Sequence, residues 1–401
     1  MTDEARPGAA HAEDLRTAFP AVIGALVCVH ASMAATRVTA SLLVLHLGYP
    51  EWIVGLLLSL FAVAPIALAL WAGRQADRFG LHRPLGVGVL MGSGGAVVAV
   101  LSQHPAAMAL AALSTGGAVA VAAVGIQREA GLMARDPSDL KRVFSWVSLG
   151  PAVSNAVAPV VVGLLIDHVG YRAGFVFAAF LPLVAWALAQ RVPRAVPLLH
   201  PAPVSARHGG AWSLLRSAPL RNLVLVNLAM SSCWDSHSFA VPVLGHVRGL
   251  SASAIGLVLG SFAVAATVVR LAISRWSDHL HERTALRTAM GAATLACALY
   301  AWLPGVVGMV LGSSLLGLAL GSVQPMLLAM LHQVTPPERH GQALGLRMLC
   351  TNAATIVMPL LFGVLAVATV PAAPMWLMGL LVLLAQWPAR RVGVKTAVPP
   401  A

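Results

Sequence analysis

The sequence predicts an all-α membrane protein with twelve transmembrane helices, arranged as two pseudo-symmetric six-helix bundles around a central cavity. Three observations predict this class: the composition, the spacing of long apolar runs and an internal repeat. Of the 401 residues, 58% are hydrophobic and 10% are charged, and the mean hydropathy is +0.82. This composition leaves too little polar surface to cover a water-soluble domain of that size. We therefore expect the chain to lie in a bilayer.

Twelve apolar runs are long enough to cross a bilayer, because a spanning helix needs about 20 mostly apolar residues. The first six runs are 19–47, 51–72, 84–102, 106–127, 143–166 and 171–190. The last six are 220–247, 253–273, 286–303, 306–331, 341–369 and 372–387. The runs are continuous and rich in Leu, Ala and Val, whereas the strands of a membrane barrel would alternate in segments of about ten residues. Helices are therefore expected.

Positive charge is distributed unequally between the loops. If the N-terminus is cytoplasmic, 22 of the 26 arginines and lysines fall in cytoplasmic segments, two of them around the loop between the tenth and eleventh runs. Only Arg172 and Arg248 fall in external loops. This asymmetry is the positive-inside rule, so the net charge of +12 reflects topology and an anionic lipid surface rather than a nucleic-acid partner. The sequence predicts a multi-pass protein of the plasma (bacterial inner) membrane with both termini cytoplasmic.

The second half of the chain repeats the first. A shift of 201 residues lays GLLLSLFAVA, residues 55–64, on GLVLGSFAVA, residues 256–265. We therefore expect a cytoplasmic N-terminal segment (1–17), an N-terminal bundle (18–190), a cytoplasmic linker (191–219), a C-terminal bundle (220–388) and a cytoplasmic tail (389–401). Paired halves with a cavity between them are typical of transporters in which one half rocks against the other.

One loop carries a family resemblance. The stretch GRQADRFGLHRPL, residues 73–85, resembles the signature between the second and third helices of the major facilitator superfamily, and PPERHGQALG, residues 336–345, resembles that superfamily's loop before the eleventh helix. The resemblance implies a twelve-helix secondary transporter. It also implies a cytoplasmic gate, whose residues here are Gly73, Asp77, Arg78, Gly80, Arg83, Arg275 and Asp278.

The charges of this loop fit a gate physically. Asp77 can meet the positive N-terminal end of a neighbouring helix and pair with nearby arginines, which would tie the halves together on the cytoplasmic face. The alternative is a topology signal with one compensating acid. The glycines at 73 and 80 permit a tight turn between two helix ends and favour the gate.

Two charges point to the transport cavity. Asp235 is the only acid well inside an apolar run, and Arg37 is the only cation near the middle of one. Placing either against lipid would cost about 3 kcal/mol or more, so both should face the cavity. Asn227, Ser231 and Ser238 share one helical stripe with Asp235. We expect Arg37 and Asp235 to pair, either as a functional pair or as a static one between the first and seventh helices.

Other polar residues inside the runs are weaker candidates. His30 and His237 could relay protons or could be satisfied packing donors. Arg270 lies one turn from a helix end, and we expect it to extend to the interface. The uncharged cavity candidates are Asn155, Gln324 and Asn352. Each could equally form a plain helix-to-helix hydrogen bond. The four cysteines show no CxxC spacing, so neither a disulfide framework nor a metal site is expected.

These features favour transport over other classes. The sequence has no nucleotide-binding loop of the kind that a primary pump needs. Its scattered histidines do not form the cluster that a membrane-embedded enzyme would need. Proton-coupled efflux of a small amphiphilic organic molecule is the first expectation. Uptake of an organic anion or metabolite, with Arg37 as the carboxylate partner, is the second. We expect a monomer with a small-molecule substrate, the lipid bilayer around it, no cofactor, and the proton gradient as the driving force.

Overall fold

The computed structural model describes residues 18–133, 139–193, 211–276, 282–335 and 339–391. The regular structure of these residues is helical, with twelve long α-helices and two short 3₁₀ helices. They form two compact units. Unit 1 comprises the described parts of residues 1–203 together with residues 249–260, and unit 2 comprises those of residues 204–248 and 261–401.

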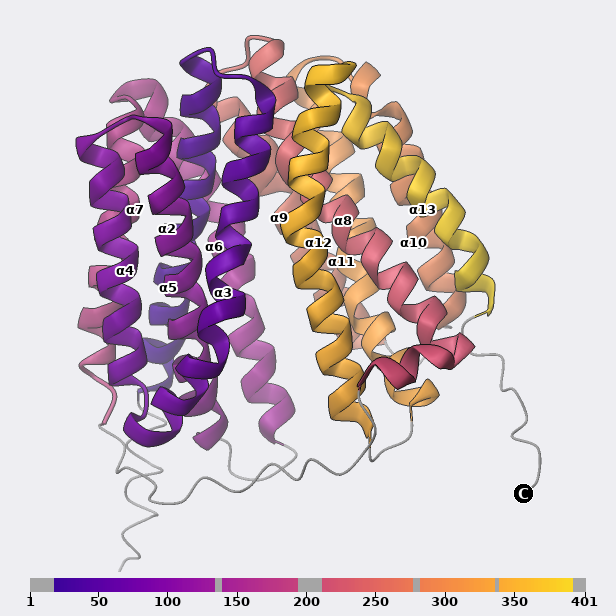
Figure 1. Cartoon of the computed structure of the whole chain (residues 1–401), viewed down its shortest axis with the longest axis horizontal. Coiled ribbons are helices and arrows are strands. Elements are labelled where there is room, and N and C mark those ends of the chain that lie inside the picture. Colours follow the sequence, from indigo (N-terminus) through magenta and orange to yellow (C-terminus); the bar gives the residue numbers. More distant parts are fainter. Residues whose placement is uncertain (1–17, 134–138, 194–210, 277–281, 336–338, 392–401) are drawn as a thin grey trace, which may run out of the picture. The chain divides into compact units, whose positions relative to one another are not determined.

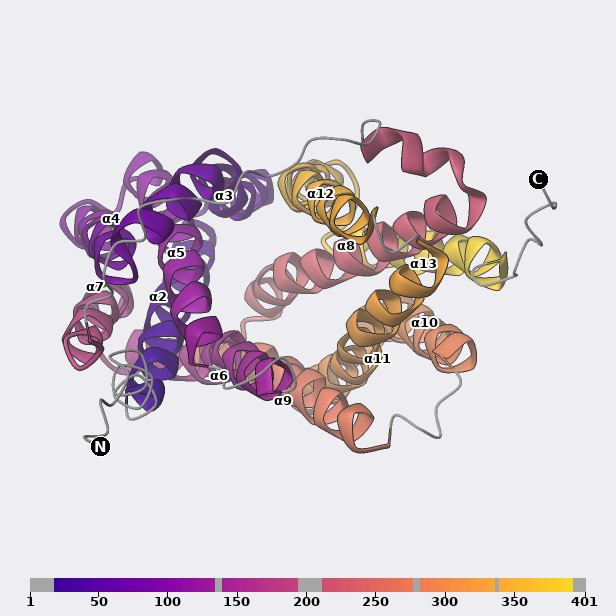
Figure 2. The ribbon, with the colours of Figure 1, turned by 90° about the horizontal axis from the view of Figure 1, so that it is seen from below.

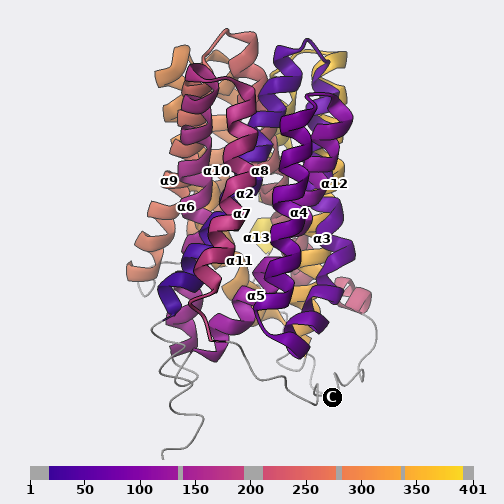
Figure 3. The same ribbon diagram turned by 90° about the vertical axis from the view of Figure 1, so that its left-hand side faces the viewer.

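Unit 1 is built from the first six long helices (Figure 1). They are α2 (Phe19–His46), α3 (Glu51–Phe79), α4 (His82–Leu101), α5 (Pro105–Leu132), α6 (Asp139–His168) and α7 (Tyr171–Ala189). Helix α5 packs against α3 and α4, and α2 packs against α6 and α7. Figure 3 faces this unit and shows α4, α2 and α7 running alongside one another. Small apolar side chains fill the space between these helices, mostly those of Ala, Val and Leu.

Unit 2 is arranged around α8 (Figure 2). Its elements are η1 (Ala211–Arg216), α8 (Ala218–Val247), α9 (Ala252–Trp276), α10 (Glu282–Leu299), η3 (Tyr300–Trp302), α11 (Gly305–Val334), α12 (His340–Ala368) and α13 (Ala373–Arg391). Helix α8 packs against α11, α12 and α13, and α10 packs against α11 and α13. Helix α9 belongs to unit 2 only from Ser261 onwards.

The described helices correspond to the twelve predicted apolar runs, and nine of them are apolar and long enough to cross a membrane by composition alone. Helices α8, α10 and α13 fall below that composition limit because polar or charged residues interrupt their apolar surface. Several helices are longer than the runs. Helix α3 continues to Phe79 where the apolar run ends at residue 72, because the backbone stays helical after the side chains become polar.

The internal repeat appears as one packing contact made twice. In unit 1 a Cβ atom added to Gly116 on α5 would clash with the backbone carbonyl oxygen of Phe61 on α3. In unit 2 a Cβ added to Gly317 on α11 would clash in the same way with the carbonyl of Phe262 on α9. Both residues of the second pair lie 201 positions after those of the first, which is the shift that aligns the sequence halves. Glycine is needed at both sites for the close approach.

The start of α9 is fixed within unit 1. The Asp167 carboxylate, near the end of α6, accepts hydrogen bonds from the backbone N–H groups of Ala252 (3.0 Å) and Ser253 (2.9 Å). These N–H groups have no partner inside their own helix, and a carboxylate also interacts favourably with the positive end of the helix dipole. Gly163 on α6 and Gly256 on α9 allow the two backbones to approach, because a Cβ at either would clash with the opposite helix.

Candidate functional site

Unit 2 contains a pocket beside α8, which we name the α8 pocket. Its volume is about 380 Å³. Helices α8, α9, α11 and α12 supply the lining residues: Asn227, Met230, Ser231, Trp234, Asp235, Arg270, Leu320, Val323, Gln324, Leu327, Thr351 and Thr355. The α8 residues in this set recur at helical spacing, so they form one face of that helix. That face carries Asn227, Ser231 and Asp235, three of the four residues of the predicted polar stripe.

A hydrogen-bond network joins three helices at one wall of the α8 pocket. The Arg347 guanidinium on α12 donates through Nη1 to Asn227 Oδ1 (3.3 Å) and to Gln324 Oε1 (3.2 Å). Asn227 Nδ2 donates to the Thr351 hydroxyl (2.8 Å), and that hydroxyl donates to the backbone carbonyl of Arg347 (2.9 Å). The charged donor fixes which side of each amide faces it. The polar wall is therefore pre-organised.

An aromatic ring and a second arginine form another wall. The Arg270 guanidinium carbon lies 5.7 Å from the centre of the Trp234 ring, within the range of a cation–π contact. Its Nε donates to the backbone carbonyl of Gly321 (3.3 Å). Trp234 also meets Phe262 edge to face, with ring centres 4.5 Å apart. Arg270 was expected to extend to the membrane interface, but the structure places it on the pocket.

The charges around the α8 pocket are mixed. Asp235 and Arg270 line it, and Arg347 donates hydrogen bonds to the amides of two lining residues. Asp235 is buried, with 8% of its surface exposed. Buried charges are costly in a bilayer unless they are compensated, so a set of two cations and one anion indicates a functional site. The set can bind a polar or charged group of a ligand while Trp234 contacts an apolar part.

The predicted histidines lie elsewhere. His237 is buried, its Nε2 lies 2.8 Å from the Ser313 hydroxyl, and its ring stacks on Phe262 with centres 4.2 Å apart. Ser313 in turn lies 2.6 Å from the Tyr300 hydroxyl. In unit 1, His30 Nδ1 lies 3.0 Å from the carbonyl oxygen four residues earlier in α2 and donates to it. Neither histidine lines the α8 pocket.

The remaining cavity candidates are divided between the units. In unit 1, the Arg37 guanidinium carbon lies 5.6 Å from the centre of the Phe61 ring, and Asn155 donates to the carbonyl of Pro151 on its own helix (2.8 Å). In unit 2, Gln324 belongs to the network above, whereas Asn352 is exposed and does not line the pocket. Pairing of Arg37 with Asp235 would join residues of different units and stays a prediction.

The predicted gate is described in part. Helix α3 ends at Phe79, and the next residue, Gly80, has a φ of 65°, which suits glycine and allows the chain to turn directly into α4. The Arg83 guanidinium carbon lies 4.0 Å from the centre of the Phe79 ring, and Gly73 and Arg78 belong to the last turns of α3. The side chains of Asp77 and Arg275, and all of Asp278, lie outside the described residues.

The family model of the Major Facilitator Superfamily matches residues 22–312 and 305–392. The chain belongs to this superfamily. The resemblance seen in residues 73–85 is thereby confirmed, as is the twelve-helix all-α class. Membership identifies the protein as an integral multi-pass membrane transporter, which is the coarse function that the sequence predicted.

Solved structures of this superfamily share the fold at low identity. A mutant of the nucleoside transporter NupG has a TM-score of 0.78 at 15% identity, covering 94% of this chain and all of its own. A bacterial homologue of the human lysosomal transporter Spinster, inward-facing and unoccupied, scores 0.72 at 14%, covering 97% and 99%. The human organic anion transporter MFSD10 (TETRAN) scores 0.64 at 18%, covering 96% and 100%. No curated protein sequence matches this chain.

Sequence reasoning missed several residues around the α8 pocket. Arg347 was counted with the cytoplasmic loop, and Trp234 and Thr351 were not singled out. The position of Arg347 within its helix could have identified it as a candidate. Helix α12 begins at His340, so Arg347 lies two turns inside the helix. The contact between Cys233 and Cys297, whose sulfur atoms lie 3.4 Å apart, was also missed, because it depends on how α8 packs against α10.

Proposed function

We propose that this transporter moves a small organic molecule across the membrane by alternating access, and that it couples efflux of this molecule to proton entry. The observation that carries the proposal is the α8 pocket, where a carboxylate, a guanidinium and an aromatic ring line about 380 Å³ inside unit 2. A concave site with a few convergent polar groups on an apolar lining is the usual form of a small-molecule site.

The lining supports an amphiphilic substrate. Trp234 and the leucine, valine and methionine side chains offer apolar contact, while amides and hydroxyls of α8, α11 and α12 offer hydrogen bonds. The volume is near the lower end of the range for ligand pockets, about 300–1,000 Å³, which favours a molecule of modest size.

Asp235 is the proposed carrier of the coupled proton. It is the acid among the described residues that line the α8 pocket. A carboxylate that pairs with a cation in one state and binds a proton in another links proton movement to the change of state. Arg37 is the proposed cation, and His30 and His237 are the next residues to test. No bound cofactor enters this proposal; the proton gradient supplies the driving force.

Uptake of an organic anion or metabolite is the second candidate. The observation that favours it is the excess of positive charge around the α8 pocket, where Arg270 lines the space and Arg347 orients two lining amides. Guanidinium groups bind carboxylates through paired charge-assisted hydrogen bonds. In this candidate the substrate carboxylate would meet an arginine, and a proton would accompany it inward.

A flux assay in proteoliposomes distinguishes the two candidates. Purified protein is reconstituted with an imposed pH gradient, and panels of neutral, cationic and carboxylate compounds are followed together with a pH-sensitive dye. Efflux coupling predicts that substrate and protons move in opposite directions, whereas anion uptake predicts that they move together. Asp235→Asn should abolish accumulation while substrate exchange persists, and Glu51→Gln, at the start of α3, is the matched control. Substrate accumulation that does not depend on the pH gradient would contradict both candidate functions.

Topology and assembly are part of the proposal. We place a monomer in the bacterial inner membrane with both termini in the cytoplasm, and assign the residues around Asp77 to a gate on that face. Single cysteines beside Arg172 and Arg248 should react with an impermeant reagent from outside, while cysteines in the linker after α7 should react only after permeabilisation. External labelling of that linker would overturn the assigned orientation. A mass twice that of the chain in light scattering of the purified protein would overturn the proposal of a monomer.

A further inference from the structure

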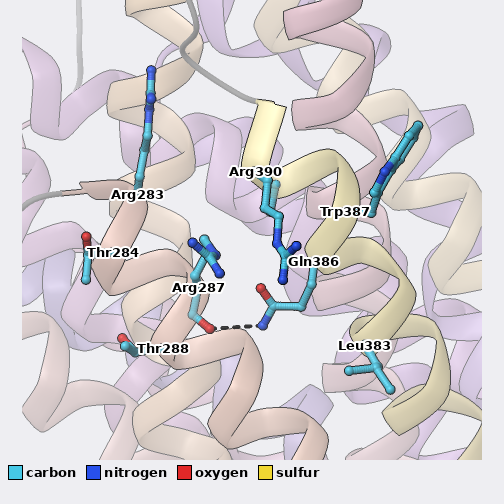
Figure 4. Close-up of a pocket in the computed structure, with 9 residues that line it drawn as sticks. Arg283, Thr284, Arg287, Thr288, Leu383, Gln386, Trp387 and Arg390 are labelled. Atoms are coloured by element: carbon cyan, nitrogen blue, oxygen red, sulfur yellow. Dashed lines mark hydrogen bonds between the residues drawn. The ribbon is translucent and has the colours of Figure 1, made fainter.

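A second concave site lies between α10 and α13, and it shares no lining residue with the α8 pocket (Figure 4). We name it the arginine cleft. Its volume is about 840 Å³, and its lining residues are Arg283, Thr284, Arg287, Thr288, Leu383, Gln386, Trp387, Ala389 and Arg390. The transport proposal gives these residues no role.

The arginine cleft is strongly cationic. Arg283 and Arg287 lie one turn apart near the start of α10, and Arg390 lies at the end of α13. Among the described residues that line the cleft there is no carboxylate. All three arginines are exposed, so none of them is withdrawn into the core of unit 2. Like charges brought together from two helices repel one another, and an anion bound between them would remove that cost.

The helix pair is held in a fixed arrangement around the cleft. Gln386 Nε2 on α13 donates to the backbone carbonyl of Arg287 on α10 at 3.0 Å, the contact drawn in Figure 4. The Arg391 guanidinium carbon lies 3.7 Å from the centre of the Trp387 ring, which orients that ring at the edge of the cleft. The Gln386 hydrogen bond therefore ties α13 to α10 at the cleft.

Apolar side chains lie directly beside the charges. Trp387 is 59% exposed and Leu383, one turn earlier on α13, is 53% exposed, and both line the cleft. The exposed leucines 380 and 384 continue this face along α13. A soluble anion would make no favourable contact with this apolar surface, whereas the acyl chains of a lipid would pack against it. Tryptophan and arginine together at a helix end are typical of the boundary between hydrocarbon and head groups.

We propose that the arginine cleft binds the phosphate head group of an anionic phospholipid, with its acyl chains against Leu383 and Trp387. The charge complementarity and the adjoining apolar face together favour a lipid over a soluble phosphate compound. Basic pockets between transmembrane helices are suited to such head groups, because each arginine near the membrane surface adds to the attraction. A bound lipid links α10 to α13 and stabilises unit 2 independently of the transport substrate.

Native mass spectrometry of the detergent-solubilised full-length protein tests this proposal. The protein is titrated separately with phosphatidylglycerol, with phosphatidylcholine and with inorganic phosphate, and bound adducts are counted. We expect phosphatidylglycerol to bind in preference to phosphatidylcholine, and inorganic phosphate to leave no adduct. The triple variant Arg283→Gln, Arg287→Gln, Arg390→Gln should bind phosphatidylglycerol on the order of a hundredfold more weakly, since each arginine contributes a factor of about five.

The matched control removes three other exposed arginines that do not line the cleft: Arg191→Gln, Arg216→Gln and Arg221→Gln. This variant should keep its preference for phosphatidylglycerol. Equal loss in both triple variants would show a diffuse surface charge and overturn the cleft as a site. Inorganic phosphate adducts that compete with the lipid would assign the cleft to a soluble anion and overturn the lipid. If the triple cleft variant does not fold, Arg283→Gln alone should still weaken lipid binding about fivefold, and an unchanged affinity would overturn the proposal.

Discussion

The two units satisfy their buried polar side chains in different ways. In unit 1, Thr36, Thr39 and Asn155 each donate to the backbone carbonyl four residues earlier on their own helix. Ser32 and Ser154 reach the backbone carbonyls of a neighbouring helix. A side chain that bonds to a carbonyl of its own helix does so independently of how the neighbouring helices pack. Such a bond therefore does not orient a polar group towards a ligand.

Unit 2 has bonds of the same kind, such as those of Thr267 and Thr355, and in addition it has bonds that join side chains of different helices. Arg347 on α12 connects Asn227 on α8 with Gln324 on α11. His237 on α8 and Tyr300 both contact the hydroxyl of Ser313 on α11. Such networks require several helices to hold one relative position, and they orient polar groups for recognition.

The difference is not one of architecture, because the glycine contacts Gly116–Phe61 and Gly317–Phe262 repeat at the same spacing. Two similar scaffolds have therefore acquired different interiors. Asp235 on α8 corresponds under the 201-residue shift to Ala34 on α2, and Trp234 corresponds to Met33. The comparison predicts that substitutions in the inter-helix network of unit 2 affect transport more than substitutions of the own-helix bonds in unit 1.

The largest effect on transport is expected from substitutions of Asp235 and Arg37, the two charges whose pairing would link the two units. Asp235→Asn should abolish proton-driven accumulation, because an amide keeps the shape but does not bind and release a proton. If Arg37 of unit 1 is its partner, Arg37→Ala alone should slow downhill substrate exchange more than Arg37→Ala combined with Asp235→Asn, since removing one member of a buried pair costs about 3–5 kcal/mol. A double-mutant cycle on transport in proteoliposomes measures this coupling. Additive effects would show that the two residues do not pair.

The next largest effect concerns the network itself. Arg347→Gln removes a charged donor from two amide oxygens, and each hydrogen bond to a charged group contributes about 1.5–3 kcal/mol. We expect the transport rate per molecule to fall on the order of a hundredfold, corresponding to about 3 kcal/mol. Initial rates in proteoliposomes with equal protein content give the measurement. The exposed Arg216→Gln is the control, and an active Arg347→Gln protein would remove the network from substrate recognition.

The shared architecture predicts equal effects in the two units. Gly116→Ala and Gly317→Ala should each destabilise the protein by about 1–3 kcal/mol, because the added methyl group meets a backbone carbonyl that has little room to move. Both variants should lower the thermal unfolding temperature of the purified protein to a similar extent. Gly94→Ala in unit 1 and Gly345→Ala in unit 2 are matched controls, since a Cβ at either position meets nothing within 4 Å. An effect confined to one unit would argue against equivalent packing.

These contrasts also show what could be predicted from the sequence. The apolar runs identify the helices because the bilayer requires a minimum apolar length, and the repeat aligns two halves because the glycines that permit close packing recur. The ends of the helices were less well predicted. Helices continue into the polar segments beyond the membrane, as α3 does to Phe79, and no change of hydropathy marks where the helix ends.

The site was predictable only along one helix. The spacing of Asn227, Ser231 and Asp235 indicates a common face of α8, because helical periodicity relates residues of the same helix. Periodicity does not indicate which other helix meets that face, so the approach of Arg347 and the turn of Arg270 towards Trp234 could not be inferred. Those contacts depend on the packing of α9, α11 and α12.

The smallest expected effect sharpens the comparison most directly, because it uses the same substitution in both units. Asn227→Ala removes an amide that bonds both Arg347 and Thr351, and we expect the transport rate to fall about tenfold, corresponding to about 1.4 kcal/mol. Asn155→Ala removes a bond to the carbonyl of Pro151, a carbonyl that already takes part in the backbone hydrogen bonds of its helix. The transport rate should therefore stay within about twofold of that of the unmodified protein. Initial rates and unfolding temperatures of both variants are compared with those of the unmodified protein. A loss of transport in Asn155→Ala at normal stability would mean that unit 1 also presents polar groups to the substrate, and recognition would then be divided between the units.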